Sequence, residues 1–137
     1  MPGIARVLVV ANRTADSEEL LAALVERKKQ GDISVTLVAP ARWEEAVHNG
    51  QQAALKHLQF ATGRLREAGI EAEALVGNAD PFTAVEQIWD PKRFDEVIVA
   101  TLPEHLSHWL RLDLTSRVER LIGRPVQHVI GHERVPT

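Results

Sequence analysis

The fold follows from Glu96-Val97-Ile98-Val99-Ala100-Thr101-Leu102-Pro103-Glu104-His105, which reads as a strand, a turn and the start of a helix. Its apolar first half, rich in Val and Ile, is typical of a strand that is covered on both faces. Ligands of open α/β sheets bind beyond the carboxyl ends of such strands. We therefore expect any site to lie after Ala100, where the chain offers Leu102-Pro103-Glu104 instead of a glycine loop.

The rest of the chain alternates between strand and helix patterns. Short apolar runs predict strands over residues 4–11, 33–39, 70–76 and 126–130, and the stretch above extends a further strand that begins at residue 94. Apolar residues at helical spacing predict helices over residues 16–30, 42–68, 80–89 and 104–122. Asp16, Asp80 and Asp113 are the predicted N-caps, with Asp113 starting a second piece of the last helix.

Strand-helix alternation of this kind is typical of a three-layer α/β domain, in which helices cover both faces of an open parallel sheet. The first and fourth strands are the most apolar, so we expect them side by side at the centre of a five-stranded sheet with the order 3-2-1-4-5. Glu71 and Glu73 alternate with apolar residues in the third strand and indicate an edge. No linker, repeat or low-complexity segment is visible, and we expect a single domain over residues 1–137.

The composition is that of an ordinary soluble domain. Hydrophobic residues make up 45% and charged residues 26% of the 137 residues, and the net charge of −3 gives no footprint for nucleic acid. The absence of cysteine excludes disulfides and thiolate chemistry. Arg6 interrupts the first apolar segment, so no signal peptide is expected, and no apolar run is long enough to span a bilayer. These features predict a cytoplasmic protein without direct membrane insertion.

Over nearly its whole length the chain resembles a universal stress protein domain. The resemblance rests on the first strand, the long second helix that ends at Gly69, the junction Gly77-Asn78-Ala79-Asp80-Pro81-Phe82, the fourth strand, and the final helix and strand around Pro125-Val126. It implies the fold of the universal stress proteins and the adenine-nucleotide alpha hydrolase-like proteins. It also implies a role in stress response or regulation.

Members of that family that bind ATP carry Gly-x-x-Gly, nine residues, and then Gly-Ser or Gly-Thr after the fourth strand. Glycines in this position let backbone N–H groups approach the phosphates. This chain has no glycine between Gly77 and Gly123. Pro103 has no N–H to donate, and the carboxylate of Glu104 would repel phosphate. The resemblance therefore does not carry over the ATP site, and we expect no cofactor and no ATP.

The candidate ligand site is the crevice at the carboxyl ends of the first and fourth strands. Arginine and histidine side chains from the two following loops are available there to hold an anion. The alternative is that Arg13 pairs with a surface carboxylate and that the last helix is simply polar on one face. The predicted lining residues are Asn12, Arg13, Thr14, Thr101, His105, Ser107, His108 and Arg111.

No catalytic or metal site is predicted. His105 and His108 share one helical face, but no third ligand has a recognisable spacing. Ser107 is not part of a Gly-x-Ser-x-Gly elbow, so we do not expect it to act as a nucleophile.

Three functions remain open from the sequence. The first is a non-catalytic, universal-stress-like domain that acts through contacts with a regulatory protein and does not depend on ATP. The second is a module that binds a small molecule, a nucleotide or another anion in the crevice. The third, a nucleotide hydrolase, is the least favoured because neither a phosphate loop nor an acidic metal-binding pair is present.

A homodimer through the last strand is also expected. Val126, Val129 and Ile130 give this strand an apolar character, and no helix follows it in the sequence. An apolar edge strand is usually covered or paired. Universal stress proteins commonly pair there, and the resemblance implies the same for this chain.

Overall fold

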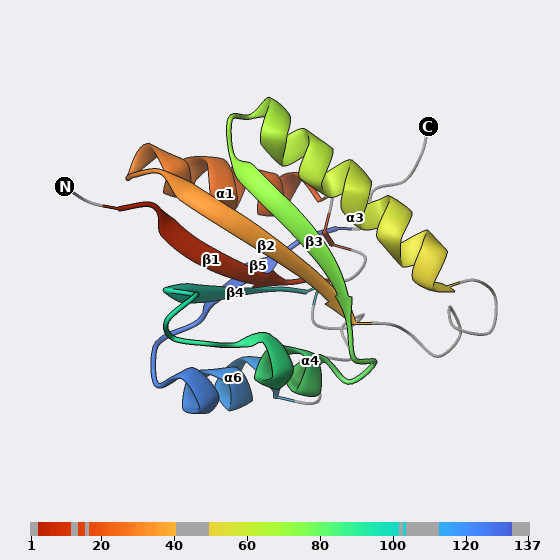
Figure 1. Ribbon diagram of the computed structural model, residues 1–137, viewed down its shortest axis with the longest axis vertical. Helices are drawn as coiled ribbons and strands as arrows, with labels where there is room; N and C mark the ends of the chain where they lie inside the picture. The colour runs from red at the N-terminus through yellow and green to blue at the C-terminus, as the bar shows by residue number, and fades with distance from the viewer. Residues whose placement is uncertain are drawn as a thin grey trace.

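The computed structural model describes residues 3–11, 14–15, 17–40, 50–101, 103 and 113–132. Its sheet has five parallel strands in the order β3-β2-β1-β4-β5, which confirms the predicted architecture (Figure 1). The strands are β1 (Ala5–Val10), β2 (Ile33–Pro40), β3 (Glu71–Gly77), β4 (Glu96–Thr101) and β5 (Gln127–Ile130).

Helices cover both faces of this sheet, as the alternation predicts. α1 (Glu18–Lys29) and α3 (Gly50–Glu67) lie on one face, and α4 (Pro81–Ile88) and α6 (Leu114–Ile122) lie on the other (Figure 1). The expected helices over 42–68 and 104–122 are confirmed over α3 and α6. Their remaining parts, residues 42–49 and 104–112, fall outside the described residues.

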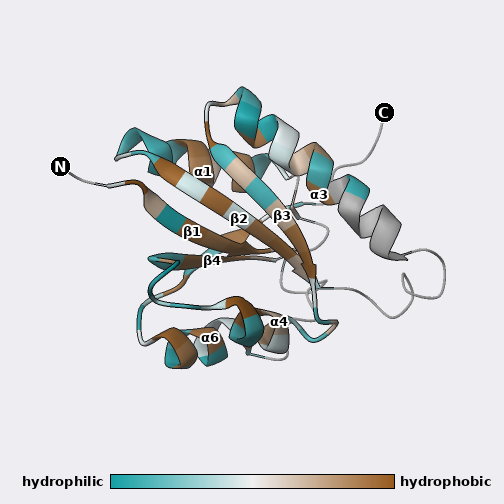
Figure 2. Ribbon diagram, viewed as in Figure 1, coloured by the Kyte–Doolittle hydropathy of each residue, from teal (hydrophilic) through white to brown (hydrophobic). Residues whose placement is uncertain are grey.

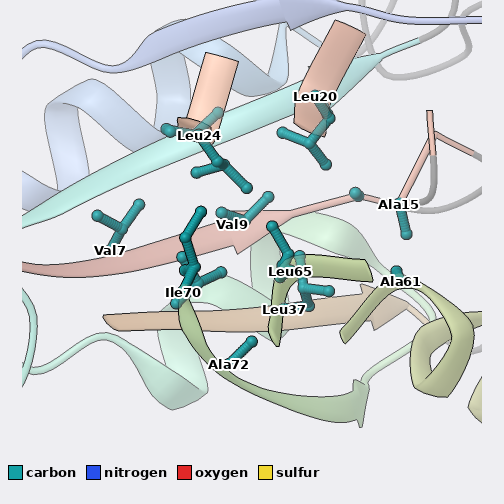
Figure 3. Packing of buried hydrophobic residues seen from close by; sticks show 14 of the residues in the cluster. Val7, Val9, Ala15, Leu20, Leu24, Leu37, Ala61, Leu65, Ile70 and Ala72 are labelled. Atoms are coloured by element: carbon teal, nitrogen blue, oxygen red, sulfur yellow. The ribbon is translucent and has the colours of Figure 1, made fainter. Parts of the chain in front are cut away.

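Two apolar cores form because side chains of a strand point alternately to its two faces. Val7 and Val9 of β1 join the core beneath α1 and α3, whereas Leu8 and Val10 join the core above α4 and α6. Figure 2 shows the hydrophobic character of β1 and β4 and the banded, alternating pattern of β3. In Figure 3, Leu20 and Leu24 of α1 and Leu65 of α3 reach toward the strand residues of the first core.

The helix starts match the predicted caps only in part. Asp16 is not the N-cap of α1; Ser17 takes that position, and its Oγ accepts a hydrogen bond from the Leu20 N–H at 3.1 Å. Asp80 caps α4 as expected, with Pro81 in the first turn. Asp113 stands at the N-cap of α6 in a left-handed conformation, but its side chain makes no capping hydrogen bond.

The amino ends of the strands are joined by ion pairs. Arg6 of β1 pairs with Asp95, and Arg27 of α1 pairs with Glu96 of β4 at 2.9 Å. The hydrogen bonds from the Arg6 side chain and backbone hold the pKa of Asp95 below its usual range. These contacts join β1, β4 and α1 at the amino ends of the strands, whereas the expected site lies at their carboxyl ends.

The two outer strands differ in their exposed surface. On β3, Glu71 and Glu73 are exposed, in agreement with the predicted edge. On β5, Ile130 is 50% exposed, but Val129 is only 8% exposed and packs into the core beneath α1. Val126 is partly buried against the other core. Of the three residues expected at a dimer interface, only Ile130 therefore has a largely exposed side chain.

None of the helices in the described ranges combines the length and the apolar character that a bilayer span requires.

Candidate functional site

The carboxyl ends of β1 and β4 lie side by side. In the register, Val10 of β1 is opposite Val99 of β4, and β1 pairs with β2 on its other side. The chain leaves β1 toward β2 and leaves β4 toward β5, so the connections run in opposite directions from this point. Ligands of open α/β sheets bind at such a switch point, because the two loops diverge and leave a crevice.

Thr14 ties the loop after β1 to the end of β4. Its side chain is 2% exposed, and its hydroxyl donates a hydrogen bond to the Ala100 carbonyl oxygen at 3.1 Å. The Thr14 carbonyl in turn accepts from the Ser17 N–H at 3.0 Å, which leads the chain directly into α1. The structure thus holds Thr14 against the end of β4.

Thr101 is the last residue of β4 and is joined to β5 by both its side chain and its backbone. The Thr101 hydroxyl lies 2.7 Å from Nε2 of His128, and the Thr101 carbonyl accepts from the Gly131 N–H at 2.8 Å. Thr101 as a whole is only 3% exposed, so it is buried at the end of β4.

His128 was not among the predicted site residues. It lies on β5 opposite Val99, which is two residues before Thr101, and burial lowers the pKa of its ring below the usual range. When the proton of the neutral ring is on Nδ1, Nε2 can accept a hydrogen bond from the Thr101 hydroxyl. The sequence carries no signal for this contact, because it depends on the register between two parallel strands.

Two glutamates in the first turn of α1 contact neighbouring segments of the chain. Glu18 pairs with Arg64 of α3 at 2.5 Å, and Glu19 accepts a hydrogen bond from the His132 N–H at 2.7 Å. The His132 ring lies on the same Glu19 oxygen, with Nδ1 at 3.3 Å. These contacts join α1 to α3 and to the residues after β5.

The structure brings Thr14 and Thr101, of the predicted lining residues, to the adjoining ends of β1 and β4. The others lie outside the described residues: Asn12, Arg13, His105, Ser107, His108 and Arg111. In the part of the chain that is described, no three histidine, aspartate or glutamate side chains gather as a metal site. Both threonine hydroxyl groups are buried and bonded within the protein, so the two residues join the strand ends to their neighbours.

Several solved structures share this fold. The universal stress protein from Archaeoglobus fulgidus, in complex with dAMP, has a TM-score of 0.65 at 16% identity, over 94% of this chain and 99% of that one. A universal stress protein family protein from Arabidopsis thaliana with AMP bound has a TM-score of 0.67 at 16% identity, over 93% and 92%. A universal stress protein in complex with cAMP has a TM-score of 0.59 at 17% identity, over 96% and 100%.

These similarities show that the chain has the universal stress protein fold. No protein-family model matches the sequence, and no curated protein matches it either. Sequence identities of this size establish an architecture and not a shared activity.

Proposed function

We propose that this protein is a non-catalytic, nucleotide-binding module of the universal stress protein type. The observation that carries the proposal is the switch point between β1 and β4, where Thr14 closes the first loop onto the end of β4 through its bond to Ala100. Residues that are already held in place before binding lower the entropy cost of binding a small ligand. The ligand would lie beyond the strand ends, between the loops that carry Arg13 and His105.

The ligand class is supported by the structures that share the fold. Three of them hold dAMP, AMP and cAMP, each of which carries one phosphate group. This finding favours the nucleotide-binding hypothesis over a function based on protein contacts alone. In the present sequence, Arg13 directly precedes Thr14, shortly after the end of β1, and its side chain can offer a bidentate, charged partner to a phosphate.

We further propose that a nucleoside monophosphate binds better than ATP. The segment Leu102-Pro103-Glu104 follows β4, where a polyphosphate would need several converging N–H groups. Pro103 lacks a donor, and Glu104 repels each added negative charge. A ligand with a single phosphate places the least charge near this segment.

The protein-contact hypothesis is a second candidate, and one observation favours it. Among the described residues, β5 pairs with β4 and has no strand on its outer edge, and Ile130 is 50% exposed. A second copy of the chain or a regulatory partner could add to this edge. A stress-response role and a cytoplasmic location remain predictions from the resemblance and the composition.

A thermal-shift screen tests the proposed function. The panel contains AMP, dAMP, cAMP, Mg-ATP and inorganic phosphate, each with the wild-type protein and with Arg13→Ala. A ligand present at 100 times its Kd stabilises the folded state by roughly 2.7 kcal/mol. We expect the monophosphates to raise the Tm of the wild type and to lose most of this effect in Arg13→Ala. A panel in which no nucleotide moves the Tm would leave the protein-contact function as the better account.

A further inference from the structure

The end of β5 packs directly against the turn that follows β1. Gly131 is buried there, and its N–H donates to the Thr101 carbonyl. A Cβ atom added to Gly131 would lie 2.6 Å from Ser17 Oγ, 3.0 Å from Ser17 Cβ and 3.4 Å from Thr14 Cγ2. Only a hydrogen atom fits between β5 and this turn.

The neighbours of Gly131 have little freedom to move aside. Ser17 Oγ is the N-cap acceptor for the Leu20 N–H, and the Ser17 N–H donates to the Thr14 carbonyl. Gly131 itself does not adopt a positive φ. The glycine is therefore required here by close packing and not by its backbone conformation.

Two more contacts fix the end of β5 on either side of Gly131. His128 contacts the Thr101 hydroxyl, and the His132 N–H donates to Glu19 in the first turn of α1. The end of β5 is thus bonded both to the end of β4 and to the start of α1. The turn between β1 and α1 is held between these attachment points.

We propose that the end of β5, through Gly131 and His128, positions the crevice by fixing the β1–α1 turn against the end of β4. The inference rests on the proposed function, because it concerns the affinity of that same site. Arg13 lies in the sequence between Ala11 and Thr14, and both of these flanking residues are fixed: Ala11 donates to the Val38 carbonyl, and Thr14 bonds Ala100. Gly131 and His128 are positioning residues, and we assign them no contact with the ligand.

The test uses a size swap in the full chain. Gly131→Ala should force Ser17 and the turn away from β5, and should weaken AMP binding by about tenfold, the change that corresponds to 1.4 kcal/mol. Adding Ser17→Gly removes both of the closest atoms, and glycine is nearly as good an N-cap as serine. The double variant should therefore recover affinity to within about threefold of the wild type. Titration calorimetry with AMP measures all three proteins.

Two controls separate positioning from a general loss of stability. Gly63→Ala makes the same chemical change at a position with no atom within 4 Å of the added Cβ. Ile33→Val changes the first residue of β2, far from the carboxyl ends of the strands, and should lower the free energy of unfolding by roughly 0.5–1.5 kcal/mol. Neither change should alter the Kd for AMP.

His128 supplies a second route to the same claim in case Gly131→Ala does not fold. His128→Leu removes the contact to Thr101 and should weaken AMP binding, whereas His128→Gln retains a side chain that can donate and accept and should restore much of it. Unchanged AMP affinity in both Gly131→Ala and His128→Leu would overturn the inference and leave the proposed function standing.

Amide hydrogen exchange at Thr14 and Thr101 tests, without any ligand, whether the end of β5 fixes the β1–α1 turn. If the wild type does not bind AMP, the proposed function fails on its own account. Faster exchange at both amides in Gly131→Ala, reversed by Ser17→Gly, would still show that β5 fixes the turn. Unchanged exchange in Gly131→Ala would contradict the claim that β5 fixes the turn.

Discussion

His128 is a strand residue whose side chain contacts the end of the neighbouring strand. It is partly buried on β5, and its Nε2 lies 2.7 Å from the hydroxyl of Thr101. Thr14 and Thr101 could be singled out from the sequence, because each lies at or shortly after the carboxyl end of an apolar strand. His128 could not be predicted, because the register of two parallel strands is set by the packing of the whole sheet.

The ring of His128 should make stability depend on pH. Burial lowers its pKa in the folded state, so the unfolded chain binds this proton more readily. The contribution is therefore complete above the usual pKa of histidine, about 6.5, and is lost as the pH falls below it. We expect the free energy of unfolding, measured by urea titration, to drop between about pH 7.5 and 5 more steeply in the wild type than in His128→Gln.

The comparison between the two proteins isolates His128 from the other histidines, which are present in both. Parallel pH profiles for wild type and His128→Gln would show that the ring titrates in the folded protein as it does in the unfolded chain.

At the scale of the helices, the start of α1 shows which of two neighbouring residues, Asp16 or Ser17, is the N-cap. The sequence favours Asp16 as the N-cap because Glu19 follows three residues later, but Ser17 makes the capping bond. The two patterns differ by one residue, and local spacing does not decide between them. The turn from Thr14 to Ser17 decides it, because the Ser17 N–H is bonded to the Thr14 carbonyl.

Replacing Ser17 should therefore cost more than replacing Asp16. Ser17→Ala removes the acceptor for the Leu20 N–H and should lower the free energy of unfolding by about 1 kcal/mol. Asp16→Ala should change it by no more than about 0.5 kcal/mol. Chemical denaturation of both variants makes the comparison, and a larger loss in Asp16→Ala would contradict the assignment of the cap.

The start of α4 gives a cap that the sequence predicts correctly. Asp80 Oδ2 accepts hydrogen bonds from the Thr83 hydroxyl at 2.6 Å and the Thr83 N–H at 3.0 Å, and the first of these is the main reason that the pKa of Asp80 is lowered. Asp80→Ala should cost about 1 kcal/mol at neutral pH, whereas Asp80→Asn, which keeps an acceptor, should cost less.

The loss in Asp80→Ala should itself depend on pH. A carboxyl group whose pKa is lowered in the folded state contributes its full stabilisation above its pKa in the unfolded chain, near 4. This stabilisation is lost as the pH falls through the pKa of the folded state. Stability curves of the wild type and Asp80→Ala should therefore converge in acid, and a constant difference down to pH 2 would argue against a charged cap.

For the whole molecule, the sequence predicts the order of the strands but not which side chains face outward on β5. The order follows from the apolar character of β1 and β4 and from right-handed crossovers, which leave few alternatives. Val129 looks like an interface residue in the sequence because it lies in an edge strand. In the structure it points into the core beneath α1, since parallel pairing sets it opposite Ala100.

The predicted homodimer should accordingly be tested at Ile130. Light scattering at micromolar concentration should show a dimer for the wild type, and Ile130→Lys should shift the population toward monomer with little change in Tm, because Ile130 is half exposed on the protomer. Val129→Lys should instead lower the Tm, since it places a charge in the core. A wild type that is monomeric throughout would exclude the dimer.

The central claim is that the crevice between β1 and β4 binds a nucleotide with a short phosphate, and titration calorimetry of AMP in competition with Mg-ATP tests it most directly. We predict that AMP binds with a Kd of about 100 micromolar or tighter, a free energy near −5.5 kcal/mol, and that Arg13→Ala weakens it by roughly tenfold. We also predict that Mg-ATP displaces AMP poorly. Binding of Mg-ATP with a Kd tighter than about 10 micromolar, or the absence of any heat with AMP at millimolar concentration, would contradict the account.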